Sequence, residues 1–272
     1  MNTYRHITAL ALALALGGCA STRPTFPAGW LVDVHGVVRA PPRAAVAAPM
    51  RAMRSAEETS PCAPGQSTAW VEIERGEDDA IVSSVGPDTN YAALACTAVT
   101  VDYNVQATRM HWPPWYASSV GLLRFDTHGV VPAGSNIVAA YYRYWVTGAR
   151  DDDHVGQTLD VRWYDPPSGT WSCADWARTP TGIVAGSKPL SNYECGGGYA
   201  CDEFEPIDIP LTNLDQIDRC GTTGLRLFIS ERPDGLPPVG VELVYPIGWE
   251  DGHATDRQSY LALCYVAPPA CP

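Results

Sequence analysis

The feature that most constrains the fold of this chain is a series of short apolar runs that begins near Glu57. Val, Ile, Tyr and Trp dominate these runs, and Gly, Pro, Asp and Asn separate them. This punctuation predicts short strands joined by turns. One capped helical turn is expected at 212–217. The predicted strands are 69–74, 80–85, 94–103, 120–125, 137–146, 159–164, 204–211, 225–230, 239–245 and 260–266.

The number and spacing of these runs indicate one domain rather than two. About ten strands in roughly 215 residues are typical of a single sandwich. A chain of this size buries a substantial core even without covalent braces. The sequence therefore predicts an all-β, antiparallel β-sandwich domain over residues 57–272.

Nine cysteines indicate a disulfide-braced protein in an oxidising compartment. If Cys19 carries lipid, eight remain, enough for four disulfides. Zinc is not favoured, because the sequence has no CxxC pair or Cys/His cluster at finger spacing. The pairing is open, but Cys195 with Cys201 and Cys96 with Cys264 are the pairs that we expect. The eight cysteines are Cys62, Cys96, Cys173, Cys195, Cys201, Cys220, Cys264 and Cys271.

The N-terminus has the pattern of a bacterial export signal. A short cationic start precedes the apolar run 7–16, which is too short to span a bilayer as a permanent helix. The run ends in Leu16-Gly-Gly-Cys19, which resembles the lipobox of bacterial lipoproteins. The resemblance implies removal of residues 1–18 and acylation of Cys19 with chains such as palmitate. An ordinary secretory signal with an incidental cysteine is the alternative.

By analogy with lipoproteins, Ala20 after the acylated cysteine favours the outer membrane, since no Asp stands there to retain the protein. The domain then faces either the periplasm or the outside. Residues 19–56 are rich in Ala, Pro and Arg, which predicts a tether rather than a folded core. We therefore expect the membrane to be a partner through the N-terminal lipid alone.

The charge distribution argues against nucleic acid as a partner. The chain has 18 Lys and Arg against 30 Asp and Glu, and its net charge is −12. Residues 20–56 hold five arginines against one aspartate, so the negative charge falls on residues 57–272. Nucleic-acid phosphates require a basic surface, which this acidic domain lacks.

Part of the chain resembles bacterial and phage jelly-roll modules. Residues 121–146, GLLRFDTHGVVPAGSNIVAAYYRYWV, are similar to a segment of DNRLRE-type domains and of relatives of carbohydrate-binding modules. The resemblance implies a jelly-roll-like sandwich and an extracellular location, but no substrate. The acidic run 151–154 and the cysteine-rich segment 195–201 depart from the pattern. Weaker similarities lie at 169–171, 176–180, 224–230 and 259–266.

A cluster of aromatic residues is the candidate ligand-binding site. Trp112, Trp115 and Tyr116 lie within five residues of one another, and two prolines stiffen the segment between the tryptophans. Exposed rings of this kind stack against the apolar faces of sugars, so a glycan is the expected ligand. The alternative is that the prolines direct these rings into the core.

Acidic runs suggest a cation site. Asp151, Asp152 and Asp153 form the candidate site for a structural calcium ion, because calcium prefers several oxygen ligands. The spacing is not that of an EF-hand, and a solvated acidic loop is the alternative. No other cofactor is expected.

No enzyme motif is present. The sequence lacks a G-x-S-x-G elbow, an H-E-x-x-H metal motif and a dinucleotide-binding fingerprint. We therefore expect a non-catalytic binding or structural module at the cell envelope, whose partner is a glycan or an envelope protein. Two alternatives stay open: an extracellular polysaccharide hydrolase that uses two carboxylates, and a structural envelope protein that binds other proteins only.

Overall fold

The computed structural model describes residues 60–73, 76–101, 105–176, 182–193, 206–246 and 259–267, with the backbone of the short strands β1 (Leu31–Val32) and β2 (Val38–Arg39). In this part of the chain no helix is long and apolar enough to cross a membrane. The signal segment, Cys19 and most of the tether lie outside the described residues.

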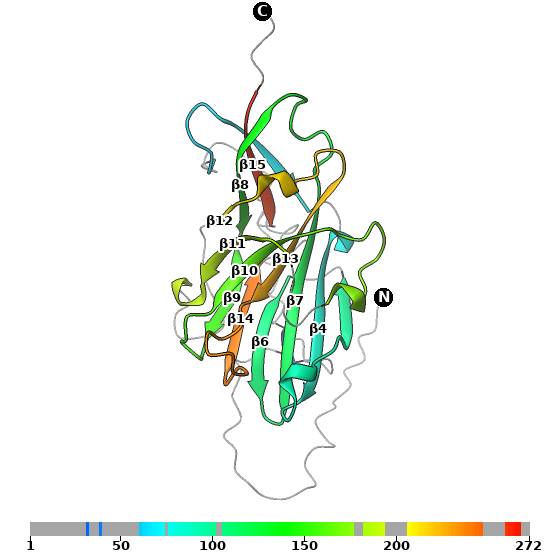
Figure 1. The fold of residues 1–272 in the computed structure, drawn as a ribbon, viewed down its shortest axis with the longest axis vertical. Helices are drawn as coiled ribbons and strands as arrows, with labels where there is room; N and C mark the ends of the chain where they lie inside the picture. Colours follow the sequence, from blue (N-terminus) through cyan, green and yellow to red (C-terminus); the bar gives the residue numbers. More distant parts are fainter. Residues whose placement is uncertain are drawn as a thin grey trace, which may run out of the picture.

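The domain is an all-β sandwich of two antiparallel sheets. In Figure 1 the smaller sheet lies toward the upper end and the β6–β7 hairpin toward the lower end. The smaller sheet has the order β12-β8-β15-β3, with bounds Ser67–Glu72 (β3), Asn136–Tyr144 (β8), Ile207–Leu211 (β12) and Tyr260–Val266 (β15). The larger sheet comprises β4 (Asp79–Pro87), β5 (Ala98–Val101), β6 (Ala107–Trp112), β7 (Trp115–Asp126), β9 (Val146–Asp151), β10 (Thr158–Tyr164), β11 (Val184–Pro189), β13 (Thr222–Ile229) and β14 (Val241–Pro246).

Strand β7 organises the larger sheet, whose main path is β11-β10-β13-β7-β6-β14-β9. β7 pairs with β6 through its residues 115–119 and with β13 through its residues 121–126. It also pairs with β4 through its residues 115–123. Gly121 lies where the pairing with β6 ends and the pairing with β13 begins. A Cβ atom there would lie 2.4 Å from Val105 Cγ1, so only glycine permits this close approach.

The main core lies between the two sheets and contains alternate side chains of both. Tyr142 and Tyr144 of β8 are fully buried, and their rings stack with centroids 4.8 Å apart. The Tyr142 hydroxyl lies 3.0 Å from Ser259 Oγ, and the Tyr144 hydroxyl lies 2.5 Å from that of Tyr193. These contacts satisfy the polar ends of rings that are otherwise surrounded by apolar atoms.

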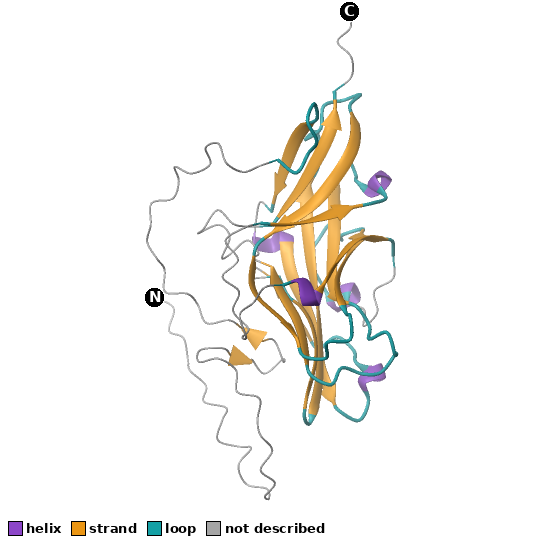
Figure 2. Cartoon of the chain, turned by 90° about the vertical axis from the view of Figure 1, so that its left-hand side faces the viewer, coloured by secondary structure: helices purple, strands orange, loops and turns teal. Residues whose placement is uncertain are grey.

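A second apolar cluster includes Val120, Leu122, Trp171 and Phe228. Cys96 and Trp176 pack against this cluster from the segments that follow β4 and β10. Loops therefore cover apolar side chains that the second sheet does not reach. Figure 2 shows such loops beside the lower half of the strands.

Two disulfides brace the described residues. Cys62 is bonded to Cys264, and Cys96 to Cys173. The predicted Cys96–Cys264 pair is therefore wrong. Cys264 is buried in β15 of the smaller sheet, whereas Cys96 lies between β4 and β5 of the larger one.

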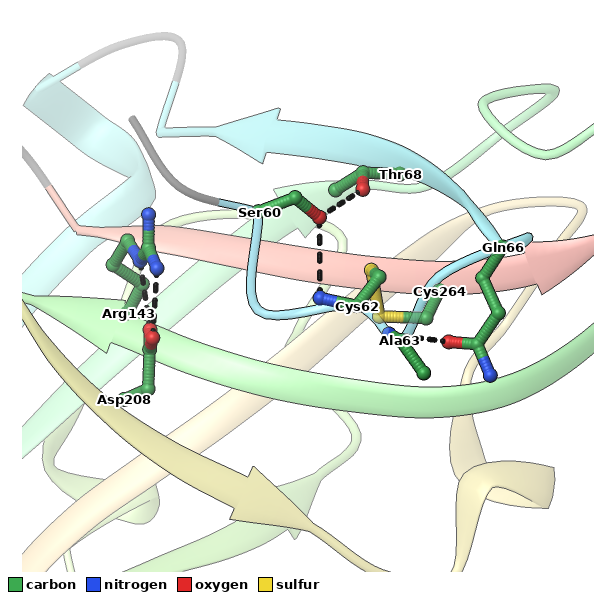
Figure 3. Close-up of a disulfide and its surroundings, with 8 residues drawn as sticks. All are labelled: Ser60, Cys62, Ala63, Gln66, Thr68, Arg143, Asp208 and Cys264. Carbon is green, nitrogen blue, oxygen red and sulfur yellow. Dashed lines mark hydrogen bonds and ion pairs between the residues drawn. A yellow bond between two sulfur atoms is a disulfide. The ribbon is translucent and has the colours of Figure 1, made fainter. Parts of the chain in front are cut away.

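Figure 3 shows the Cys62–Cys264 bond beside Ser60 and Gln66, whose side chains accept hydrogen bonds from the backbone N–H groups of Cys62 and Ala63. Cys220, which we expected to be disulfide-bonded, is instead exposed and free. The other candidates, Cys195, Cys201 and Cys271, lie outside the described residues, so the Cys195–Cys201 pair stays a prediction.

Each of the ten predicted runs contains a strand, and the predicted helical turn is present at Leu214–Gln216. Five further strands in the described part of the chain were not predicted: β1 and β2, which lie in the predicted tether, and β6, β9 and β11. The sequences of the last three, ATRMHW, VTGARD and VAGSKP, contain Gly, Pro or charged residues and few large apolar ones. Pairing with neighbouring strands, rather than intrinsic propensity, makes these segments extended.

Candidate functional site

The predicted aromatic patch forms the tip of the β6–β7 hairpin. Pro113 and Pro114 make the turn, and the peptide bond between them is cis. Trp112 and Trp115 face each other in the strand register, so their side chains leave the same face of the hairpin. Trp115 is 51 % exposed, and Trp112 is half-buried. The sequence thus placed two of the three predicted rings correctly beside each other.

Tyr116 points the other way. Its ring is paired with that of His111, at a centroid distance of 4.5 Å, and contacts Tyr91 at 5.1 Å. It is only 9 % exposed and packs in a cluster with Leu94. Adjacent residues of a strand project to opposite faces, so Trp115 and Tyr116 cannot belong to one platform. The structure therefore removes Tyr116 from the candidate site.

Two more apolar side chains lie at the same end of the sheet. Strand register places Pro87 of β4 opposite Trp115. On the other side, the backbone N–H of His111 donates to Gly240 O at 2.9 Å, which brings the segment that contains Val239 alongside the end of β6. Pro87 is exposed, and Val239 is 68 % exposed. We refer to Pro87, Trp112, Trp115 and Val239 as the tip cluster.

The three candidate calcium ligands hold this end of the sheet together instead. An Asp153 carboxylate oxygen accepts the Gly240 N–H at 2.8 Å, and the other accepts a hydrogen bond from Arg232 at 2.7 Å. Asp152 accepts the N–H of Val241 at 3.0 Å, and Asp151 accepts that of His154 at 2.9 Å.

The calcium hypothesis finds no support in this geometry. Among the described residues, no group of three or more His, Cys, Asp or Glu side chains is arranged to hold a metal ion. The carboxylates of the 151–153 run bind loop donors at close range, and those donors occupy the oxygens that an ion would need. Asp152 and Asp153 fix the loop that carries Val239, and Asp151 fixes the turn at His154.

Glu242 of β14 lies under the same loop and is fully buried. Its Oε1 atom accepts the backbone N–H groups of Asp152 at 3.0 Å and Asp153 at 2.7 Å. Burial raises the pKa of Glu242 to about 9, and the neighbouring Asp151 carboxyl group adds to this effect. At neutral pH this side chain is therefore an uncharged acid inside the sheet.

A cleft of about 860 Å³ lies elsewhere on the larger sheet. Its walls come from β5, the C-terminal end of β7, the segment after β10 and the segment before β13. We refer to it as the acidic cleft, because its lining includes five carboxylates and one arginine, Arg124. The carboxylates are Glu77, Asp78, Asp126, Asp165 and Asp218.

Sequence reasoning missed this cleft. Its carboxylates are spread from position 77 to position 218, and only Glu77 and Asp78 belong to an acidic run, Glu77-Asp78-Asp79. That run was the one local signal, and it carries no ligand chemistry by itself. Chain topology brings the rest together.

These features describe a class of protein: a disulfide-braced, antiparallel β-sandwich with an exposed aromatic hairpin tip and an acidic cleft. Comparison with known families and with curated proteins finds no family model and no curated protein that matches this chain. The likeness to DNRLRE-type and carbohydrate-binding modules consequently stays a prediction that rests on the sequence segments themselves.

Proposed function

We propose that this protein is a lipid-anchored envelope protein whose β-sandwich is a non-catalytic, glycan-binding module. The observation that carries this proposal is the tip cluster, in which Trp115 is 51 % exposed directly across the hairpin from Trp112. Aromatic rings offer a large apolar area at a low cost in conformational entropy. An exposed indole is suited to stack against the apolar face of a sugar ring.

The tip cluster is held in place before any ligand arrives. The cross-strand register fixes both tryptophans, and Asp152 and Asp153 fix the loop that carries Val239. Neighbouring strands are about 4.8 Å apart, so the paired positions from Pro87 through Trp115 to Trp112 span about 10 Å. A rigid apolar strip of this length supports binding to an extended glycan, because little order is lost on association.

The proposed location is the outer membrane, with the lipid on Cys19 and residues 20–56 as the tether. Two disulfides support an oxidising compartment. The tether leaves the module either in the periplasm or on the cell surface, and a glycan partner exists in both places.

A polysaccharide hydrolase is the second candidate, since the acidic cleft contains several carboxylates. A glycosidase needs a general acid whose pKa is raised by burial. Asp126, Asp165 and Asp218 are exposed, and Asp78 is paired with Arg124. The cleft is therefore better suited to hold a ligand than to protonate one.

The test is binding of the full-length protein to a panel of soluble glycans and to peptidoglycan, measured by calorimetry and pull-down. Trp115→Ala is expected to weaken binding at least about tenfold, the loss of one good aromatic contact. Ile183→Ala, which shortens another exposed apolar side chain, serves as the matched control.

Unchanged melting temperatures in both variants would show that the fold is intact. Binding that survives Trp115→Ala unchanged, or no binding to any glycan, would overturn the proposal. The second result would favour a structural role with protein partners.

A further inference from the structure

The acidic cleft is remote from the tip cluster. Trp115 opens β7, whereas Arg124 and Asp126 of the cleft lie at its other end. Nine residues of extended strand separate Trp115 from Arg124, a distance of about 30 Å. The volume of about 860 Å³ is within the range of small-molecule sites. The cleft is thus a second place where a ligand could be held.

Arg124, the arginine that lines the cleft, already donates its hydrogen bonds to protein acceptors. Arg124 donates to Asp78 Oδ1 at 2.9 Å and to the backbone oxygens of Glu77, Pro167 and Gly169 at 2.9 to 3.1 Å. Its guanidinium carbon also lies 5.1 Å from the ring centre of Trp171. Because protein acceptors take up these donors, Arg124 braces the cleft and has little capacity left for an anionic ligand.

The rim carries uncompensated negative charge. Asp126, Asp165 and Asp218 are all exposed, and none has a cationic partner within the described residues. Asp126 and Asp218 each accept one backbone N–H, from His128 at 3.0 Å and from Cys220 at 2.9 Å, which orients the carboxylates. An anionic ligand would be repelled here, and a cationic one attracted.

Part of the lining of the cleft is apolar. Val99 and Val101 of β5 and Pro166 and Pro167 after β10 contribute it, and Val101 is 44 % exposed. This apolar lining is an observation independent of the charge, because a bare metal ion or a small amine would gain nothing from it. The combination fits a ligand that has both a C–H face and a positive group.

We propose that the acidic cleft binds glycan units that carry a free, protonated amine. The C–H face of such a sugar lies against Val99 and Val101, and the ammonium groups along the glycan pair with the separate rim carboxylates of Asp126, Asp165 and Asp218. This inference rests on the proposed function only in taking the ligand to be a glycan. It uses a different surface and different residues.

The experiment uses the full-length chain with Trp115→Ala, so that stacking at the tip does not contribute. Two probes of equal length are titrated by calorimetry: a glucosamine tetramer, with free amines, and an N-acetylglucosamine tetramer, which is neutral. The buffer is mildly acidic, which keeps the amines protonated. The triple variant Asp126→Asn/Asp165→Asn/Asp218→Asn tests the rim, and Asp215→Asn, an exposed aspartate outside the cleft, is the control.

The expected result is that the glucosamine tetramer binds and the acetylated one does not. Affinity for the former falls at least about tenfold in the triple variant and with added salt, and it is unchanged in Asp215→Asn. Asparagine keeps the acceptors for the loop N–H groups, so an equal melting temperature is expected. Equal binding of both tetramers, no binding of either, or binding that survives the triple variant would overturn the inference. Loss of acetylated-glycan binding in Trp115→Ala tests the proposed function separately.

Discussion

At the scale of single residues, a row of buried polar side chains crosses the larger sheet. Register places Glu242 opposite both Asp151 and Arg109, Arg109 opposite Ser118, and Ser118 opposite Ser84. Residues that face each other in antiparallel strands share a face, so these side chains are neighbours. Buried charge must be paired or neutralised. Arg109 is paired with a carboxylate outside the row, that of Glu231, and Glu242 is neutralised by protonation.

The protonated Glu242 leads to a prediction about pH. Unfolded, this residue loses its proton near pH 4.5, whereas in the fold the pKa is about 9. Between these values the folded state binds one more proton, so the free energy of unfolding decreases as pH rises through this window. Glu242→Gln removes the titration. The melting temperature of the wild type is expected to fall more steeply with pH than that of the variant.

Differential scanning calorimetry across this pH window measures the effect, with Asp215→Asn, an exposed carboxylate, as the control. The control is expected to follow the wild type. Parallel pH profiles for Glu242→Gln and the wild type would show that Glu242 does not carry the proton.

At the scale of elements, the two sheets meet where β11 passes β12. The N–H of Thr212 donates to Ala185 O at 2.7 Å, and Gly186 lies against Ile209 and Pro210. A Cβ atom on Gly186 would lie 2.6 Å from both Ile209 Cγ2 and Pro210 O. The absence of a side chain therefore lets an edge of the larger sheet close against an edge of the smaller one, which shields both edges.

Gly186→Ala is expected to destabilise the domain by about 1–3 kcal/mol, because the added methyl group overlaps a backbone oxygen that cannot move aside alone. Chemical denaturation followed by tryptophan fluorescence measures the change. Gly169→Ala is the matched control, since nothing lies within 4 Å of its added Cβ atom. Equal denaturation midpoints for the two variants would contradict this account of the closure.

At the scale of the whole molecule, each disulfide joins distant parts of the chain. Cys62 and Cys264 are 202 residues apart, and Cys96 and Cys173 are 77 apart. Closing loops this long restricts the unfolded chain, which contributes about 2–5 kcal/mol per bond. Replacing either pair by serine is expected to lower the melting temperature, as measured by circular dichroism, and a reducing agent should mimic the loss. A wild type whose melting temperature is the same with and without reductant would refute this role.

Membrane attachment is the other whole-molecule prediction. If Cys19 carries the lipid, Cys19→Ala removes the only membrane attachment that we propose. The variant, expressed in a bacterial host, is expected to leave the membrane fraction in a flotation gradient, while the wild type floats with lipid. A variant that still floats would show that something other than acylation holds the chain there.

Local pattern alone predicted most of the fold. Strands such as Thr158–Tyr164 alternate apolar and polar residues, and turn residues bound them, so their positions depend on nearby sequence. Strands β6, β9 and β11 escaped prediction because few large apolar residues mark them, and their extended form depends on pairing with other strands: β7 and β14 for β6, β14 for β9, and β10 for β11. Strand alternation predicts that Trp115 and Tyr116 lie on opposite faces of β7, provided that Pro113-Pro114 is recognised as a hairpin turn.

The sequence by itself determined the all-β class, the positions of ten strands and the proximity of Trp112 to Trp115, because each depends on residues close along the chain. The tertiary structure decided the pairing of Cys264 with Cys62, the burial of Glu242 and the assembly of the acidic cleft. Each of these joins segments many residues apart, and the strand order that brings them together is set by packing of whole sheets rather than by any local signal.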